Sequence, residues 1–325
     1  MSNTHGPATP SSGTATSSDR AMDGADLESF ESSHVHANGL RFHVVCCGPK
    51  HGPPVLLLHG FPEFWYSWRH QLRALGKAGY RAIAPDLRGY NLSDKPVGVR
   101  SYYMKELLND VVALVGALGY TSVDLIGHDW GGAIAWSVAA SAEHRHVVRR
   151  LVVMNAPHPT SFLNGMSLAQ LRRSWYMLFF QIPLLPEHVL AKNNFAGLRR
   201  MLGRSAAPGT FSDLDLDRFI EAMTQPGALT SAISYYRGIL RQNPFAELKR
   251  LSPIPVRLPV LLIWGERDVA LGKELTYNLH PLVENLRIEY VHDAGHWVQQ
   301  ERPDSVNRAL LAFLDEAKQP AGAAR

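Results

Sequence analysis

The sequence predicts an α/β fold, in which a mostly parallel sheet carries helices on both faces. Short, mostly apolar runs recur along the chain, and such runs are typical of strands buried on both faces. Helical patterns alternate with several of these runs, which favours βαβ units and a parallel sheet. A chain of 325 residues can bury a large core without disulfide bonds. The predicted strands comprise residues 55–58, 82–84, 123–126, 151–154, 260–264 and 288–291.

A β-hairpin precedes the first of these strands. Residues 34–37 and 40–46 have strand patterns, and the Asn38-Gly39 pair between them is typical of a two-residue turn. The first 18 residues include 15 Ser, Thr, Pro, Gly or Ala, so we expect residues 1–30 to form a disordered tail. The predicted helices of the alternating region comprise residues 65–75, 104–118, 132–142 and 306–317.

One long segment breaks the alternation of strands and helices. Between Pro159 and about Pro255 the sequence has helical patterns, at residues 168–180 and 214–223, but no pattern of a buried strand. We therefore expect a core formed by residues 31–159 and 251–325, with a helical insertion at residues 160–250. Ligands of open α/β sheets bind beyond the carboxyl ends of the strands, so an insertion there would act as a lid over a pocket.

Composition excludes several functional classes. The 33 basic and 29 acidic residues leave a net charge of +4. Over 325 residues, this excess of positive charge is too small to indicate binding to nucleic acid or to an acidic membrane. Cys46 and Cys47 are adjacent, which excludes a disulfide scaffold and favours a reducing compartment, so we expect a cytoplasmic protein. No apolar run is long enough to span a bilayer, and no signal-peptide pattern occurs. Zinc-ligand patterns and glycine-rich phosphate loops do not occur either, so we expect no metal and no cofactor.

The most informative stretch is VDLIGHDWGG at residues 123–132. A buried strand leads through Gly127-x-Asp129-x-Gly131 into a helix, which is the layout of a nucleophile elbow. Serine is usual at the central position, whereas an aspartate there can attack an alkyl carbon and form an ester. An aspartate that only caps the helix is the simpler interpretation of Asp129 alone. The flanking glycines and the preceding strand favour the nucleophile.

A carboxylate nucleophile needs a base that activates water for the second step. His296 follows the last predicted strand, where the chain order of this layout puts the base. Asp268 follows the strand at residues 260–264 and is the natural acid to orient that histidine, although Glu266 competes for the role. The segment that begins at Asn155, after the strand at 151–154, offers no carboxylate, which favours Asp268.

Backbone amides complete the predicted reaction centre. In nucleophile-elbow enzymes, the amide after the nucleophile and one in the loop after an earlier strand bind the oxyanion. Here these are the amides of Trp130 and of Phe61, in the His59-Gly60-Phe61-Pro62 loop.

Together these residues resemble the epoxide hydrolases of the α/β-hydrolase fold. The resemblance covers residues from about 33 to the end, and four separate motifs agree in order and spacing. They are HGFPEFWYSWRHQ at 59–71, PDLRGYNLSD at 85–94, GHDWGG at 127–132 and DAGHWVQQERP at 293–303. The resemblance implies an eight-stranded, mostly parallel sheet with a helical cap inserted after the sixth strand. It also implies conversion of a small apolar epoxide to a vicinal diol through an ester on Asp129, without a cofactor.

The family also uses two cap tyrosines that donate hydrogen bonds to the epoxide oxygen. Tyr176 matches the first and Tyr236 the second, with Tyr235 the alternative one position away. Aromatic packing within the lid is the simpler interpretation of these rings. An O–H donor opposite the attacking carboxylate would stabilise the departing alkoxide, which favours a functional role. We expect the substrate to contact the aromatic residues Trp65, Phe179, Phe180 and Trp297, in addition to Phe61.

Four alternatives remain. A haloalkane dehalogenase resembles this chain in its fold, its aspartate and the tryptophan that follows, but needs no pair of phenols. A fluoroacetate dehalogenase typically carries arginine where Trp130 stands. A serine esterase has little support, because the serines in small-residue motifs, Ser167 and Ser205, lie in the lid with no strand before them. A non-catalytic receptor would have lost the triad or the cap donors. The sequence leaves the oligomeric state open, with a homodimer as one option.

Overall fold

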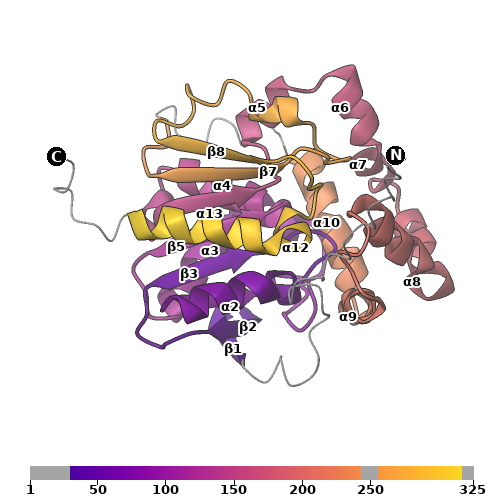
Figure 1. The fold of residues 1–325 in the computed structure, drawn as a ribbon. Coiled ribbons are helices and arrows are strands. Elements are labelled where there is room, and N and C mark those ends of the chain that lie inside the picture. Colours follow the sequence, from indigo (N-terminus) through magenta and orange to yellow (C-terminus); the bar gives the residue numbers. More distant parts are fainter. Residues whose placement is uncertain (1–29, 243–254, 317–325) are drawn as a thin grey trace, which may run out of the picture.

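Eight strands form one sheet in the order β1-β2-β4-β3-β5-β6-β7-β8 (Figure 1). We describe residues 30–242 and 255–316 of a computed structural model. Strand β2 is antiparallel to β1 and β4, and every other neighbouring pair is parallel. The predicted mostly parallel α/β sheet is therefore confirmed. The strands are β1 Glu31–Ala37, β2 Leu40–Cys47, β3 Pro54–Leu58, β4 Arg81–Pro85, β5 Val123–His128, β6 Val148–Met154, β7 Val260–Gly265 and β8 Leu286–Val291.

The predicted hairpin is formed by β1 and β2. Ala37 pairs with Leu40, which leaves Asn38 and Gly39 as the two turn residues. Both have positive φ, 48° and 72°, as a turn that follows the twist of the strands requires.

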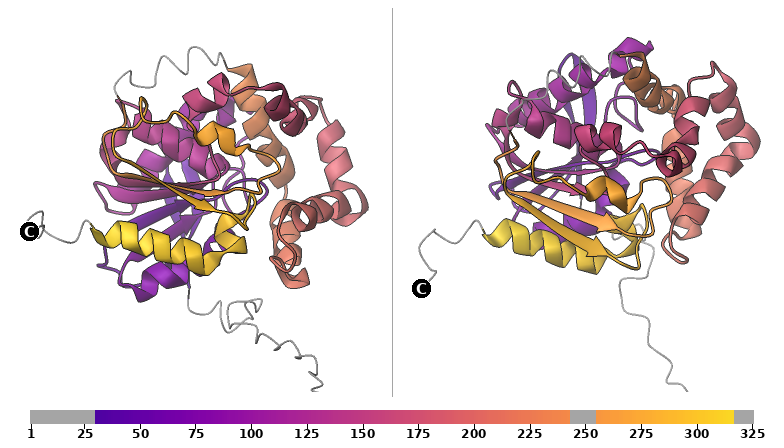
Figure 2. Two further views of the ribbon diagram at one scale, coloured as in Figure 1. Left: turned by 45° about the horizontal axis from the view of Figure 1, so that its top comes forward. Right: turned by 90° about the horizontal axis from the view of Figure 1, so that it is seen from above.

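Helices cover both faces of the sheet (Figures 1 and 2). Alternate residues of β3 enter different cores, because successive side chains of a strand point to opposite faces. Val55 and Leu57 pack in a cluster with residues of α2 and α13, while Leu56 and Leu58 pack with residues of α3 and α4. The helices of this core are α2 Arg69–Lys77, α3 Met104–Ala117, α4 Trp130–Ala140, α12 Val298–Glu301 and α13 Pro303–Glu316, with short 3-10 helices at Trp65–Trp68, Val99–Tyr102, Arg145–Val147 and Lys273–Thr276.

The segment between β6 and β7 is helical, and its described part, up to residue 242, contains no strand. These helices gather at one end of the sheet, as the predicted cap requires (Figure 2). The predicted helix at 168–180 is divided at Ser174 into two shorter ones. The cap helices are α5 Pro159–Asn164, α6 Leu168–Arg173, α7 Trp175–Phe179, α8 Leu185–Ser205, α9 Asp213–Thr224 and α10 Ala228–Arg241.

Two predictions fall largely outside the described residues. They are the disordered tail at 1–30, of which only Phe30 is described, and the end of the cap near residue 250. In the described part of the chain, no helix is both long and apolar enough to cross a membrane.

Candidate active site

Asp129 lies on a sharp turn between β5 and α4. Its φ of 49° and ψ of −118° are a strained combination for a residue with a side chain. The turn is tight: a Cβ on Gly131 would lie 2.0 Å from the carbonyl oxygen of Leu58, and one on Gly60 would lie 2.4 Å from the Asp129 Cβ. Only glycine fits at these two positions. Asp129 occupies the N-cap position of α4, but its side chain makes no capping hydrogen bond, so the helix-cap interpretation does not explain it.

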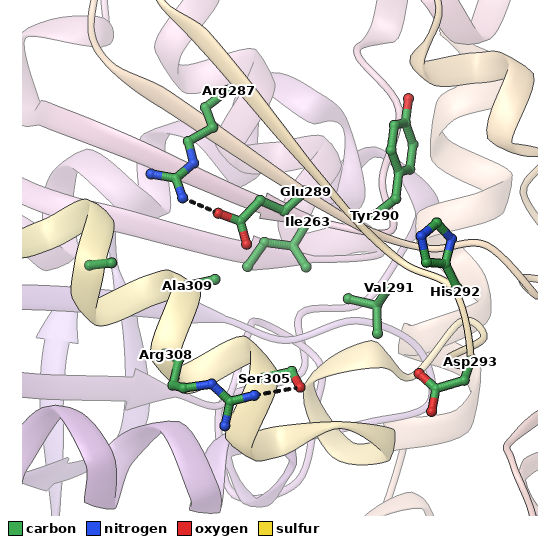
Figure 3. A pocket seen from close by; sticks show the side chains of 11 residues that line it. Ile263, Arg287, Glu289, Tyr290, Val291, His292, Asp293, Ser305, Arg308 and Ala309 are labelled. Carbon is green, nitrogen blue, oxygen red and sulfur yellow. Dashed lines mark hydrogen bonds and ion pairs between the residues drawn. The ribbon is translucent and has the colours of Figure 1, made fainter.

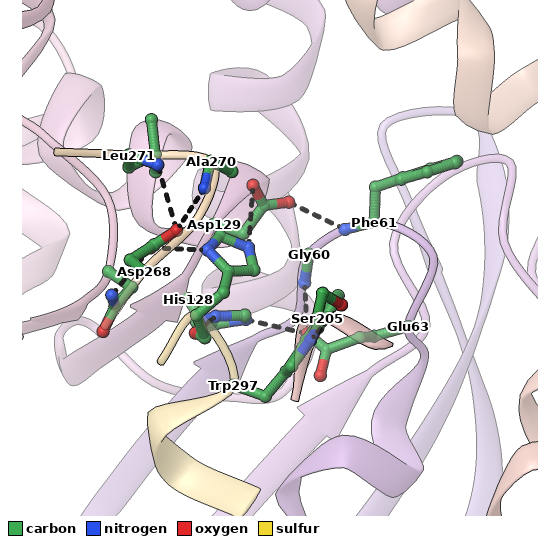
Figure 4. A network of polar contacts seen from close by, with 12 residues as sticks. Gly60, Phe61, Glu63, His128, Asp129, Ser205, Asp268, Ala270, Leu271 and Trp297 are labelled. Atoms are coloured by element: carbon green, nitrogen blue, oxygen red, sulfur yellow. Dashed lines mark hydrogen bonds and ion pairs between the residues drawn. The ribbon is translucent and has the colours of Figure 1, made fainter. Parts of the chain in front are cut away.

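His296 and Asp268 follow the carboxyl ends of two neighbouring strands, β8 and β7, and both approach Asp129. Figure 4 shows Asp268 beside Asp129. Nδ1 of His296 is 2.8 Å from Oδ2 of Asp268, and Nε2 of His296 is 3.7 Å from Oδ2 of Asp129. His296 and Asp268 are both buried, with exposed fractions of 6% and 7%. Asp268 thus holds one ring nitrogen, and the other faces the predicted nucleophile.

Asp268 is held by three further donors. Its Oδ1 accepts the backbone N–H groups of Ala270 at 2.7 Å and Leu271 at 2.9 Å. Its Oδ2 accepts from the Asn155 side-chain amide at 2.8 Å. Asn155 in turn accepts the Gly265 N–H at 2.8 Å, which ties the ends of β6 and β7 together. The segment that begins at Asn155 lacks a carboxylate, as expected from the sequence, but its side-chain amide has a supporting role that was not predicted.

The electrostatic setting favours an ionised Asp268 and a protonated His296. Although burial favours the neutral ring, the charge and hydrogen bond of Asp268, with Asp129 adding to them, raise the pKa of His296 to about 9. Burial opposes ionisation of Asp268 as well, but His296 and the surrounding donors lower the pKa of that carboxyl group. The two groups therefore form a buried ion pair in the resting protein.

Glu266, the competing acid, lies elsewhere. It pairs with Lys273 and with His292, and the His292 side chain is exposed. Within the described residues, it has no hydrogen bond or ion pair with His296, so the geometry favours Asp268 as the orienting acid.

A second buried pair, Glu63 and His128, lies beside the backbone of His296 and was not predicted from the sequence. Nδ1 of His128 lies 2.8 Å from the Glu63 carboxylate, and Nε2 lies 2.8 Å from the backbone carbonyl oxygen of His296 (Figure 4). The carbonyl oxygen can only accept, so Nε2 carries the hydrogen of that bond, while Nδ1 faces the carboxylate. Glu63 also accepts from Gln300 at 2.6 Å, and its side chain and that of His128 are fully buried. This pair fixes the backbone that carries His296.

The two predicted oxyanion donors lie beside the nucleophile. The Phe61 N–H donates to Oδ1 of Asp129 at 2.8 Å. Trp130 is the first residue of α4, where a backbone N–H has no acceptor within the helix. Both amides are thus positioned for negative charge that develops on the Asp129 carboxyl group.

A cavity of about 550 Å³ connects Asp129 with the cap, within the size range of small-molecule sites. Tyr176 and Tyr236 both line it, and their rings lie 5.7 Å apart. Burial and the nearby Asp129 raise the pKa of both phenols, so they stay protonated and able to donate. Much of the remaining lining is apolar, including Met104, Leu108, Phe162, Leu163, Met177 and Ile239.

Tyr235 points elsewhere. Its hydroxyl donates to the Arg88 carbonyl oxygen at 2.8 Å, and its ring packs against those of Tyr90 and Tyr102. The cavity is therefore reached by Tyr236 and not by its neighbour in the sequence.

The two tryptophans that we expected to contact the substrate lie outside this cavity, which corrects that expectation. The Trp65 ring packs edge-on against Phe30 at 5.6 Å. The Trp297 indole N–H donates to the Ser205 hydroxyl at 2.9 Å, and its ring packs against His296. Trp297 thus supports the catalytic histidine from outside the cavity.

The two expected phenylalanines of the cap also lie outside the cavity lining. Phe179 packs against Trp175, toward the outside of the cap, where the Trp175 side chain is exposed. Phe180 is buried and contacts the rings of Phe61 and Tyr236 at 5.7 and 4.9 Å. Phe180 therefore positions Tyr236, while smaller aliphatic side chains face the lumen.

A second pocket, of about 510 Å³, lies between β8 and α13 (Figure 3). Its charged groups contact each other: Arg287 pairs with Glu289, and Arg308 donates to the Ser305 hydroxyl. None of the predicted site residues lines it. Across residues 30–242 and 255–316, no group of three or more His, Cys, Asp or Glu could hold a metal ion.

Known proteins resemble this chain in sequence and in fold. A family model for the alpha/beta hydrolase fold matches residues 53–303. The AB hydrolase superfamily protein YfhM of Bacillus subtilis is 38% identical over 290 residues, which cover 89% of this chain and 99% of that protein. Epoxide hydrolase 4 of Mus musculus is 41% identical over 292 residues, which cover 87% of this chain and 78% of that protein. The crystal structure of a Bacillus megaterium epoxide hydrolase in complex with an inhibitor has a TM-score of 0.78 at 32% identity, covering 87% of this chain and 100% of that one. The chain is therefore a hydrolase of the α/β-hydrolase family, and within that family it belongs with the epoxide hydrolases.

Proposed function

We propose that this protein adds water to an apolar epoxide and releases a vicinal diol, through an ester on Asp129. In the first step, a carboxylate oxygen of Asp129 attacks a ring carbon and the carbon–oxygen bond of the ring breaks. Tyr176 and Tyr236 donate hydrogen bonds to the departing oxygen, and one of the two phenols transfers its proton to it, which makes the first hydroxyl and leaves a tyrosinate.

The second step releases the product from Asp129. His296 removes a proton from a water molecule, and the resulting hydroxide attacks the ester carbonyl carbon. The N–H groups of Phe61 and Trp130 stabilise the oxyanion. When the oxyanion collapses, the diol leaves with the proton from His296. The other proton of the water passes from the Asp129 carboxyl group back to the tyrosinate, which restores both side chains. Asp268 stays ionised throughout and holds the ring.

One observation carries this proposal. The carboxylate of Asp129 lies 3.7 Å from Nε2 of His296, and its cavity is shared with the two buried phenols Tyr176 and Tyr236. An oxygen leaving group needs such donors, whereas a halide leaves as a stable anion. The dehalogenase alternative therefore has weaker support, and two of the three relatives reported above carry the name epoxide hydrolase. The expected cytoplasmic location and the homodimer stay predictions.

The experiment is turnover of styrene oxide without added metal or cofactor. In heavy-oxygen water, a single turnover should place unlabelled oxygen in the diol and the label in the protein, because the oxygen that is added to the ring carbon comes from Asp129. Asp129→Asn should abolish both the label and the turnover. Asp213→Asn is the matched control, because it neutralises a carboxylate whose side chain is 94% exposed at the start of α9. Labelled diol in the first turnover would refute the ester, and turnover of bromoalkanes but not epoxides would favour the dehalogenase.

A further inference from the structure

The cavity continues beyond the nucleophile along helix α4. Ala133, Ser137 and Ser141 all line it. Ala133 and Ser137 lie on one face of α4, and Ser141, four residues further on, directly follows the last residue of the helix, so the three form a row. At a rise of about 1.5 Å per residue, the distance along α4 from Asp129 to Ser141 is about 18 Å. The lumen is therefore elongated in the direction of α4.

The side chains of this row are small, and apolar residues of other elements share the lumen with them. Met104 and Leu108 come from α3, and Met177, Ile239 and Leu240 come from the cap. At the far end, the wall reaches the protein surface, where Lys105 and Glu143 are exposed. A chain that starts at Asp129 therefore has room to extend between α3, α4 and the cap.

The polar groups of the row already have partners within the protein. The Ser137 hydroxyl donates to the Ala133 carbonyl oxygen at 2.8 Å. Nε2 of His144 lies 3.1 Å from the side-chain oxygen of Asn109, so we assign the ring hydrogen to that nitrogen. Nδ1 of His144 then accepts from the Ser141 hydroxyl at 2.8 Å. Because the hydroxyl groups of Ser137 and Ser141 already have hydrogen-bond partners, an apolar chain can lie against this row without leaving a buried donor unpaired.

We propose that the substrates of this site are epoxides with a long, unbranched apolar chain that lies along α4, and that Ser137 and Ser141 set the longest chain accepted. This inference deepens the proposed function and depends on it for the identity of the reacting group. An extended chain advances about 1.2 Å per bond, so about 18 Å accommodates about fifteen bonds. Each methylene that is buried should raise kcat/KM about fourfold until the lumen is filled.

The test compares terminal epoxides of unbranched alkenes from butene to hexadecene. Ser137→Leu should end the rise in kcat/KM about five carbons earlier than Ser141→Leu, because the two positions lie about 6 Å apart along the helix. The control Thr224→Leu adds the same side chain at an exposed position of α9 and should follow the unmodified protein. Melting temperatures establish that each variant folds.

A second measurement separates this inference from the proposed function. Unbranched alcohols of the same lengths should raise the melting temperature of the unmodified protein, and the two leucine variants should lose this shift for the longer alcohols in the same order. If the alcohols show the expected length limit but no epoxide is turned over, the proposed function is refuted and the inference about chain length is not. Leucine variants in which kcat/KM depends on chain length as in the unmodified protein would overturn the inference. So would a Ser141→Ala variant whose kcat/KM for long chains is as low as that of Ser141→Leu.

Discussion

The charge on Asp129 should control whether His296 can act as a base. In the resting protein, Asp268 and Asp129 together hold the pKa of His296 at about 9, despite the opposing effect of burial. A protonated ring cannot accept a proton from water. Formation of the ester removes the Asp129 charge, which lowers the pKa of His296 when the base is needed. Asp129→Asn reproduces this loss of charge without any substrate.

The size of the effect follows from the separation of the two groups. At 3.7 Å, two unit charges interact with about 1 kcal/mol in water and about 4 kcal/mol at an effective dielectric constant of about 20. One pKa unit corresponds to about 1.4 kcal/mol, so Asp129→Asn should lower the pKa of His296 by about 1 to 3. Asp268→Asn should lower it further, because Asp268 is closer, at 2.8 Å, and accepts a hydrogen bond from the ring.

Nuclear magnetic resonance titration of the His296 ring gives these values directly. The signal is assigned by its absence from a His296→Gln variant, and the exposed Asp213→Asn variant is the control for loss of a distant charge. An unchanged pKa in Asp129→Asn would refute the coupling. A larger decrease in Asp129→Asn than in Asp268→Asn would refute the order of the two contributions.

Three further predictions concern the remaining groups. Tyr176→Phe and Tyr236→Phe should each lower kcat/KM for epoxides about 10- to 100-fold, because each removes a hydrogen bond to a developing alkoxide; steady-state kinetics that match the unmodified enzyme would show that the phenols do not take part. Asn155→Ala should lower the free energy of unfolding by about 2 kcal/mol, measured in urea, because it removes a buried hydrogen bond to the Asp268 carboxylate. The raised pKa of His296 stabilises the fold fully below its ordinary value of 6.5, and this stabilisation is lost as the pH rises to about 9. The free energy of unfolding should fall by up to about 3 kcal/mol over that range, and a His296→Gln variant with the same fall would refute this origin.

The strands were predictable because burial on both faces leaves a simple signal in the sequence. Runs such as residues 55–58 and 260–264 became central strands with every residue buried. The run at residues 288–291 is different, because β8 lies at the edge of the described sheet and is only partly buried. The break at Ser174 was not predicted, since the apolar pattern continues across it while the backbone does not.

The proximity of Asp129, His296 and Asp268 was predictable from chain order, but the groups that hold them in place were not. Asn155, Glu63 and His128 act through contacts between the ends of different strands, and no local pattern marks such convergence. The residues that we expected to contact the substrate are marked in the sequence by their aromatic character, but the sequence does not show in which direction their side chains point. Trp65 and Phe179 were chosen for aromatic character, but their direction depends on packing within short helices, and both rings face other aromatic residues.

The proposed reacting groups and the residues that we propose to limit substrate length lie in different parts of this molecule. The reacting groups stand at the carboxyl ends of central strands, where Asn155 and the Glu63–His128 pair fix them with buried hydrogen bonds. The length of the cavity is instead set by one face of α4 and by the cap, which line it away from Asp129. Substitutions at Ser137 or Ser141 can therefore change which chains are accepted while the triad keeps its geometry. Substitutions at Asn155 or Glu63 should lower the rate for every substrate alike, because they act through the position of the reacting groups.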